Sequence, residues 1–263
     1  MEKKQKKTKN NLKYTLITVT TFIVFLVVWQ ILAMYDILGK YMPSPYEVCQ
    51  AFMFKLQNIG PDGSTLGDNI LTSFYVAFSG FILAVVVGVP MGLLMGWYKW
   101  FHRFLDPIFE ILRPIPAVAW IPLMIVWIGV GLPAKALIIF VSAFVPCVIN
   151  SYSGIRQTTP VLINVAKTYG ASSFYTFLHV GVPFAVPMIF AGMRVALATS
   201  WGTLVAAEML AASSGLGYMI SMARSFGRAD IVVLGMVIIG LLGYIFTWIF
   251  SKIEDAVNKG GVV

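Results

Sequence analysis

The sequence predicts an all-α membrane protein with six transmembrane helices and with both termini in the cytoplasm. Hydrophobic residues make up 59% of its 263 residues and charged residues only 11%, whereas about a quarter of an ordinary soluble domain is charged. The mean hydropathy of +0.83 is typical of chains that cross a membrane several times. Six apolar stretches are long enough to cross the hydrocarbon core, which takes about 20 helical residues rising about 1.5 Å each. These observations exclude a soluble domain.

The first apolar stretch, Tyr14–Tyr35, sets the orientation of the chain. A cleaved signal peptide would have a core of about 7–15 apolar residues and a small-residue cleavage site, whereas this longer stretch runs into Asp36. It is therefore predicted to remain as a transmembrane helix. The net charge of +8 could suggest binding to nucleic acid, but the position of the basic residues argues against it. Basic residues beside a span favour the cytoplasmic side, so the lysines before this stretch indicate a cytoplasmic N-terminus. The six lysines before the stretch are Lys3, Lys4, Lys6, Lys7, Lys9 and Lys13.

Five further stretches complete the predicted topology. An even number of spans returns the C-terminus to the side on which the chain starts. This topology places thirteen lysines and arginines inside and five outside, with Arg194 left unassigned, and the asymmetry supports it. The five stretches are Asn69–Tyr98, Glu110–Gly131, Ala136–Ile155, Pro183–Ala207 and Ile231–Ser251.

Two segments outside the spans carry structure of their own. Residues 36–68 are expected to form an outer loop with an amphipathic helix around Tyr46–Leu56, which would lie in the membrane interface. The segment Ala212–Asp230 is too short to span and too apolar for a free loop, so a re-entrant or outer helix packed on the bundle is expected. Cys147 is predicted to be a buried packing residue and Cys49 a free outer thiol, so no disulfide is indicated.

The segment from Asn164 to Pro183 does not fit a membrane span. It is predicted to form a short helix, a break at Gly170 and a second short helix that ends before Pro183. Glycine adopts backbone angles that are closed to other residues, and proline disfavours helical geometry in the residue before it.

The segment has an Asn-x-Ala start, a glycine four residues after Ala166 and a Val-x-Val-Pro end. This spacing resembles the cytoplasmic coupling loop of ABC importer permeases. Two further blocks resemble the nitrate, sulfonate and taurine permease subfamily, and the resemblance runs from about Asn69 to Ser251. These blocks are Leu112-Arg-Pro-Ile-Pro-Ala-Val-Ala-Trp-Ile-Pro122, with Trp127-Ile-Gly-Val-Gly131 after it, and Val205-Ala-Ala-Glu-Met-Leu-Ala-Ala-Ser-Ser-Gly-Leu-Gly217.

The resemblance implies a permease subunit of an ATP-driven importer in the bacterial cytoplasmic membrane, which forms the pathway for a small, anionic nutrient such as a sulfonate, taurine or nitrate. The chain would not be an enzyme and would bind no cofactor or metal, because a separate ATPase, in two copies, would use ATP and Mg. Other implied partners are an extracytoplasmic solute-binding protein, a second copy of the permease and membrane lipid. Residues 1–68 would form the N-terminus, first span and outer loop, residues 69–252 the transport domain with its coupling loop at 156–182, and residues 253–263 a cytoplasmic tail.

The resemblance also implies which residues hold the ATPase. The family usually has an acidic residue where this chain has Asn164. A short amphipathic helix would present side chains, Phe177 among them, to a groove on the partner. The predicted coupling residues are Asn164, Ala166, Gly170, Ala171, Ser172, Phe174, Tyr175 and Pro183.

Four residues are candidates for the pathway or its gate: Arg194, Glu208, Trp120 and Trp201. Charged groups deep in a membrane are costly and usually face water or a partner. Arg194 lies about 16 Å along a helix from Pro183 if the fifth span begins there. Glu208 is expected near the outer end, whereas the tryptophans as a class also suit packing or interfacial positions.

Three patterns within the spans predict helix geometry. Glu110 and Arg113 share one helix face, because they are three residues apart. Prolines loosen the third span at Pro114, Pro116 and Pro122. Glycines recur every fourth residue in the second span and predict close helix packing there, at Gly88, Gly92 and Gly96.

Two other functions remain as alternatives. A secondary transporter driven by an ion gradient would need acidic or histidine residues within its spans and often has inverted repeats, and neither is evident. A membrane-embedded enzyme would need a polar catalytic cluster at depth. The sequence has no phosphate-binding Gly-x-x-x-x-Gly-Lys-Ser/Thr motif, and its two histidines, His102 and His179, are too far apart to suggest a metal site.

Overall fold

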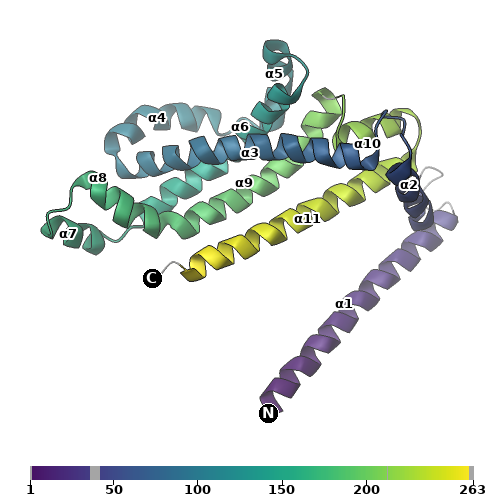
Figure 1. Cartoon of the computed structure of the whole chain (residues 1–263), viewed down its shortest axis with the longest axis horizontal. Coiled ribbons are helices and arrows are strands. Elements are labelled where there is room, and N and C mark those ends of the chain that lie inside the picture. The colour runs from purple at the N-terminus through teal and green to yellow at the C-terminus, as the bar shows by residue number, and fades with distance from the viewer. Residues whose placement is uncertain (1, 36–41, 212, 261–263) are drawn as a thin grey trace.

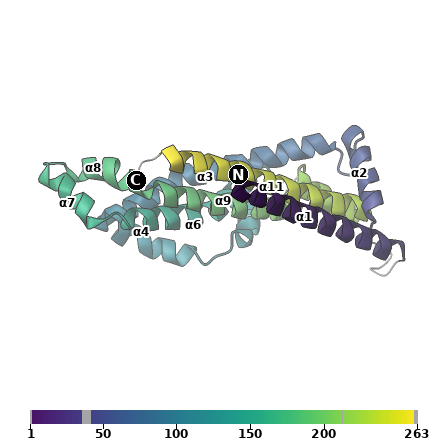
Figure 2. The same ribbon diagram turned by 90° about the horizontal axis from the view of Figure 1, so that it is seen from below.

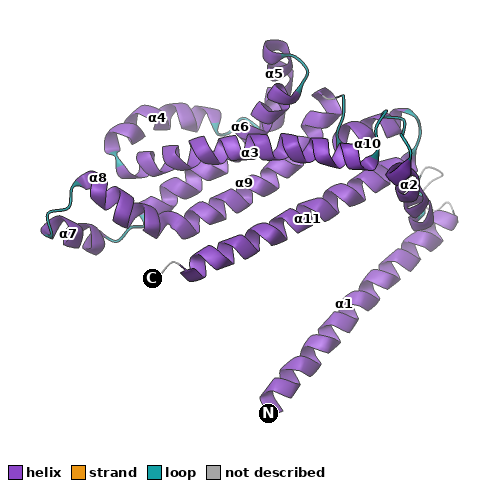
Figure 3. Cartoon of the chain, in the orientation of Figure 1, coloured by secondary structure: helices purple, strands orange, loops and turns teal. Residues whose placement is uncertain are grey.

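The computed structural model describes residues 2–35, 42–211 and 213–260. These residues are almost entirely helical and contain no strand, which confirms the all-α part of the predicted fold class (Figure 3). Five helices are long and apolar enough to cross a membrane, and a bent helix pair makes a sixth if it is counted as one span. The elements are α1 (Glu2–Met34), α2 (Pro45–Gln57), α3 (Leu66–Trp97), α4 (Lys99–Leu112), η1 (Ala117–Trp120), α5 (Ile121–Ile128), α6 (Leu132–Arg156), α7 (Pro160–Thr168), α8 (Ser173–Thr176), η2 (Phe177–Gly181), α9 (Val182–Ala211), α10 (Leu216–Ser225) and α11 (Ala229–Gly260).

Helices α3, α6 and α9 form the centre of the bundle, and α11 packs beside them (Figures 1 and 2). A Cβ atom added at Gly92 would lie 2.9 Å from the Cβ of Ser151, and one added at Gly88 would lie 3.0 Å from the Cβ of Cys147. Gly96 similarly faces the backbone of Tyr152. The predicted glycine face is therefore confirmed, because only glycine lets α3 approach α6 this closely.

The third predicted span is not a continuous helix. Helix α4 ends at Leu112, and the chain resumes helical structure at Ala117 after a bend of 84°. The expectation of one helix over Glu110–Gly131 is therefore wrong in this detail. The physical reason is the proline pair Pro114 and Pro116, because proline removes a backbone donor and restricts the residue before it.

The second helix of the coupling segment does not end before Pro183, contrary to the sequence prediction. Helix α8 continues through the π-helical turn η2 into α9. The backbone N–H of Val182 donates to the carbonyl of Phe177, five residues earlier. Proline has no backbone N–H to donate within a helix, and this wider turn accommodates Pro183 without a break in the helix.

Short helices cover the end of the bundle that lies opposite α7 and α8. Helix α2 crosses this end (Figures 1 and 2) and begins with a capping box, in which Ser44 and Glu47 satisfy each other's backbone N–H groups. Helix α10 packs on α9, α11 and α3, in agreement with the expected packed helix, although Ala212 and residues 36–41 lie outside the described residues. Helix α1 contacts α2 and then diverges from the bundle.

Candidate functional site

The turn between α7 and α8 projects beyond the end of the bundle (Figure 1). Gly170 has a φ of +81°, as its predicted role in the turn requires. The N–H of Ala171 donates to the carbonyl of Ala166 at 3.0 Å and closes the end of α7. Ser172 then caps α8 by accepting from the N–H of Tyr175 at 3.1 Å. Two successive caps therefore fix the angle between the two short helices.

The exposed surface of this turn is apolar and aromatic. Phe174 is 64% exposed and Tyr175 54% exposed, and Tyr169 also projects into open space. Asn164 and Pro183 are exposed as well. Exposed apolar side chains gathered at one tip are typical of a surface that another protein covers.

Phe177 faces the bundle and not the open side of the turn, contrary to the expectation that it would contact a partner. It is buried, with its ring 5.7 Å from that of Trp97 and 5.8 Å from that of Tyr98. Gly181 lies against the indole of the same Trp97. The two aromatic residues of α8, Phe174 and Tyr175, are therefore exposed, whereas Phe177 at the start of η2 anchors the turn to the corner between α3 and α4.

A second candidate surface is a concave face of about 640 Å³ between the bent third span, α6 and α9. Hydroxyl groups line it, and those of Ser142 and Thr203 are hydrogen-bonded at 2.8 Å. Arg113 lies at its edge and pairs with Glu110 at 2.8 Å, as their spacing predicted. The other lining residues are Ile115, Pro116, Ala117, Val118, Val141, Val145, Pro146, Ile149, Asn150, Val195, Thr199 and Gly202.

None of the four residues predicted for the pathway is among the residues that line this concave face. Arg194 forms an ion pair with Glu254 of α11, although the next residue, Val195, lines the face. Trp201 packs against α11 and donates to the carbonyl of Ile239 at 2.9 Å. Trp120 lies at the bend of the third span, where its buried Nε1 has no acceptor among the described residues.

Glu208 is fully buried near the C-terminal end of α9. Its carboxylate accepts from the hydroxyl of Ser73 at 2.8 Å and from the N–H of Gly217 at 2.9 Å. A buried carboxylate needs such donors, because desolvation of an ionised group is costly. Sequence reasoning found Glu208 but missed Ser73, for which the available signal was the i, i+4 spacing of Asn69 and Ser73 on one face of an apolar helix.

A buried ion pair near Glu208 also escaped the sequence analysis. Lys55 of α2 lies 2.6 Å from Asp62, and both side chains are almost fully inaccessible. Asp62 also accepts from the amide of Asn69 at 2.6 Å. No sequence pattern predicted this pair, because the loop between α2 and α3 brings the two residues together.

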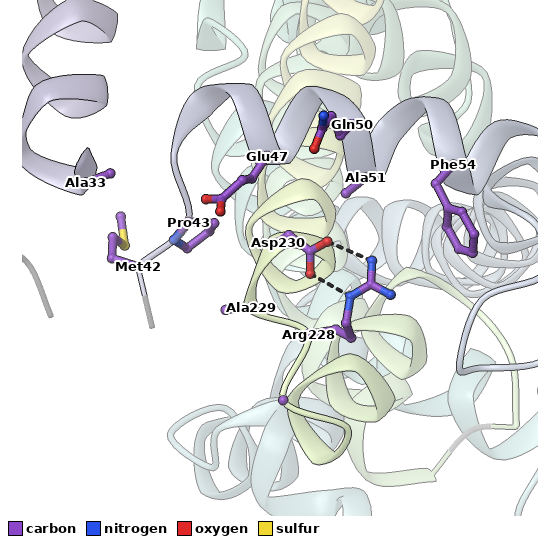
Figure 4. Close-up of a pocket in the computed structure, with 11 residues that line it drawn as sticks. Ala33, Met42, Pro43, Glu47, Gln50, Ala51, Phe54, Arg228, Ala229 and Asp230 are labelled. Atoms are coloured by element: carbon purple, nitrogen blue, oxygen red, sulfur yellow. Dashed lines mark hydrogen bonds and ion pairs between the residues drawn. The ribbon is translucent and has the colours of Figure 1, made fainter. Parts of the chain in front are cut away.

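A polar groove of about 520 Å³ lies where α1, α2 and the start of α11 meet (Figure 4). Arg228 donates twice to Asp230, at 2.7 and 2.9 Å, and this hydrogen bonding raises the pKa of Arg228 above its usual value. The guanidinium also lies 5.7 Å from the ring centre of Phe54. Glu47 and Gln50 of α2 line the same groove.

Comparison with known proteins identifies the family of this chain. The family model of the binding-protein-dependent transport system inner membrane component matches residues 84–259. The chain belongs to this family. The permease is 34% identical to the taurine transport system permease protein TauC of Escherichia coli, over 87% of this chain and 84% of that protein.

The permease is also 34% identical to the nitrate import permease protein NrtB of Synechocystis, over 89% of this chain and 86% of that protein. Its fold matches a solved structure of the MetNI methionine ABC transporter with a TM-score of 0.65 and 22% identity, covering 73% of this chain and 95% of that chain. The permease is therefore the membrane component of an ABC importer in the cytoplasmic membrane, not an enzyme, and ATP is used by a separate ATPase subunit.

Proposed function

We propose that this permease carries a small anion of the sulfonate, taurine or nitrate type along the concave face between its third and fifth spans. The observation that carries the proposal is the concave face itself, where one hydroxyl of the bonded pair Ser142 and Thr203 keeps its hydrogen free to donate to an oxyanion. Arg113 is the only charged residue in its lining; a cation attracts anions, although the ion pair with Glu110 partly offsets this charge. The names of TauC and NrtB, which are taurine and nitrate permeases, favour the same class of substrate.

The concave face is open on one side, which favours a homodimer. Two copies related by a two-fold axis would close two such faces around one pathway. Two ATPase subunits would then dock, one on each coupling loop. The mass of the purified complex is expected to fit two permeases and two ATPases, and a complex with a different second membrane subunit would refute the homodimer.

The α7–α8 turn is the proposed docking site of the ATPase. Asn164, Ala166, Ala171 and Ser172 would shape the turn, and Phe174 and Tyr175 would contact the partner, with Pro183 leading into α9. Replacing Gly170 with valine would strain a residue whose φ is +81° and displace α8. We expect the Gly170→Val permease to insert into the membrane but to lose the ATPase on co-purification.

Gly63 provides a matched control, because it has a φ of +75° and, like Gly170, has no atom near an added Cβ. It lies in the outer loop, so Gly63→Val carries similar strain at the opposite end of the bundle. The Gly63→Val variant should keep the ATPase. Equal retention of the ATPase by both variants would refute the proposed docking site.

Residues Arg194, Glu208, Trp120 and Trp201 remain proposed contributors to the pathway or its gate. Uptake of radiolabelled taurine, ethanesulfonate and nitrate into proteoliposomes that hold the complex and its solute-binding protein tests the proposal. Uptake of one of these anions should require ATP inside the vesicles. Uptake that instead follows an imposed ion gradient without ATP would support a secondary transporter.

A further inference from the structure

We propose that Lys135 of α6 is the residue that binds the anionic cargo at the end of the pathway that α5 covers. The inference deepens the proposed function and rests on it, because it assumes that the cargo passes along the concave face between the third and fifth spans. Lys135 lies beyond the end of that face, where α5 packs on α6 and α9. Separation of α5 from α6 would expose its ammonium group to the pathway.

The first observation is the position of Lys135 along α6. Ser142 and Ile149 of this helix line the concave face and are seven residues apart. Seven residues make almost two helical turns, so residues at this spacing lie on the same side of a helix, about 10.5 Å apart along its axis. Lys135 is seven residues before Ser142 and is thus the next position on this side. It continues the lining of the concave face toward the end of the bundle that lies opposite α7 and α8.

The packing of α6 on α9 brings Glu208 to the same end of the bundle. The two helices run in opposite directions, and Ser142 of α6 is hydrogen-bonded to Thr203 of α9 at 2.8 Å. From this contact, seven residues back along α6 lead to Lys135, and five residues forward along α9 lead to Glu208. The ammonium and the carboxylate interact electrostatically through space. The seam between α6 and α9 therefore carries hydroxyl groups at its middle and charges at this end.

The second observation is that Lys135 is buried without a partner at bonding distance. It is 4% exposed, and its ammonium makes no hydrogen bond and no ion pair with any residue that the structure describes. The carboxylate of Glu208 instead accepts from the hydroxyl of Ser73 and the N–H of Gly217. A buried ammonium without an acceptor is costly, and charged groups at depth usually face a partner or water. An anion in the pathway would supply the acceptor that the described part of the protein does not.

The third observation is that two other cations close to the concave face already have counter-ions. Arg113 forms an ion pair with Glu110, and Arg194 forms one with Glu254. Each carboxylate offsets the attraction of its arginine for a further anion. Lys135 has only the more distant charge of Glu208, and a charge in surroundings of low dielectric constant acts more strongly than in water. Of these three cations, Lys135 is therefore the one whose charge is most available to the cargo.

Helix α5 covers this end of the lining through apolar contacts. Two of its side chains pack in one buried cluster with residues of α6 and α9, and the cluster contains Ile121, Met124, Ala134, Ile138 and Ala207. Among the residues that the structure describes, no hydrogen bond or ion pair joins α5 to α6 or α9. Apolar contacts are not directional, so α5 can separate from α6 without leaving a polar group unpaired. This separation would connect the ammonium of Lys135 with the concave face.

Chemical restoration of the charge tests the proposal in the complete permease–ATPase complex. The Lys135→Cys substitution is made in a Cys49→Ser chain, in which the remaining thiol, that of Cys147, is buried. Aminoethyl methanethiosulfonate forms a disulfide with the introduced thiol and releases methanesulfinate, and the added group ends in an ammonium at a length close to that of lysine. Hydroxyethyl methanethiosulfonate adds a group of similar size without a charge and is the matched control.

The measured quantity is the amount of anion imported per ATP hydrolysed by proteoliposomes that hold the complex and its solute-binding protein. We expect Lys135→Cys to lower it on the order of tenfold, as for the loss of a hydrogen bond to a charged group. The aminoethyl group should restore most of the import, and the hydroxyethyl group should not. The Cys49→Ser parent, treated with either reagent, gives the background. Equal import after both reagents, or normal import by the untreated variant, would refute the role of Lys135.

The rate of the same disulfide reaction tests whether the pathway reaches this position. Lys135 is buried in the conformation described, so the introduced thiol should react slowly in the resting complex. It should react several times faster while the complex hydrolyses ATP and imports the anion. Equal rates in the two conditions, or no reaction in either, would refute the exposure of this position during transport.

Two further variants separate a role in binding from a role in folding. Lys135→Met keeps an unbranched side chain without the charge, and Lys135→Arg keeps the charge. Both should co-purify with the ATPase, while only Lys135→Arg should retain anion import per ATP. Loss of the ATPase from both variants would make Lys135 a structural residue and refute the inference. If the wild-type complex shows no ATP-dependent uptake of an anion, the proposed function is wrong, whereas normal import by Lys135→Met would refute only the role of Lys135.

Discussion

The contact between α3 and α6 leads to a quantitative prediction about Gly92. A Cβ atom at this position would lie 2.9 Å from the Cβ of Ser151 and 3.1 Å from the backbone nitrogen of Tyr152, and closer still to the carbonyl of Val148. Backbone atoms cannot move aside without separating the two helices. Gly92→Ala is therefore expected to destabilise the bundle, because overpacking costs about 1–3 kcal/mol.

Gly240 is the matched control for this substitution. It also lies within a long spanning helix, but an added Cβ would have no atom within 4 Å. Replacing glycine by alanine in a helix gains up to about 1 kcal/mol from propensity alone, and both variants share this gain. The two variants should therefore differ by about 1–3 kcal/mol from packing.

Thermal unfolding in detergent, followed by tryptophan fluorescence, measures this difference. At about 2–4 °C per kcal/mol for a chain of this size, Gly92→Ala should unfold roughly 2–12 °C below Gly240→Ala. If Gly92→Ala unfolds at the same temperature as Gly240→Ala or at a higher one, the claim that α3 and α6 can pack closely only with glycine at position 92 is refuted.

Two further predictions concern the ion pairs. Asp62→Ala should destabilise the bundle by about 3–5 kcal/mol, because it leaves the charge of Lys55 buried without its counter-ion. The double variant Lys55→Met/Asp62→Leu should recover most of that loss in the same unfolding assay. If Arg194 serves the pathway, Arg194→Gln should lower anion uptake while the ATPase still co-purifies. Glu254→Gln, which removes the charge of its partner in the ion pair, should leave uptake unchanged. Equal losses of uptake in both variants would assign Arg194 to its contact with α11.

The resemblance to a coupling loop located the α7–α8 turn, but it did not determine how the turn joins the bundle. Gly170 could be placed because its backbone angle is a local property of glycine. The inward direction of Phe177 could not, because it depends on Trp97 and Tyr98, about 80 residues earlier in the chain. Glu208 was recognised as a costly charge, yet its partners come from α3 and α10 and follow only from the packing of those helices.

The sequence by itself determined the features that depend on composition and local spacing. Long apolar stretches require helices in a membrane, and the glycine repeat specifies which face of α3 packs closely. Only the tertiary structure decided the ion pair of Arg194 with Glu254 and the buried hydrogen bond of Ser73 with Glu208. These features join segments far apart in the chain, and their energies depend on distance and burial, which a linear pattern does not specify.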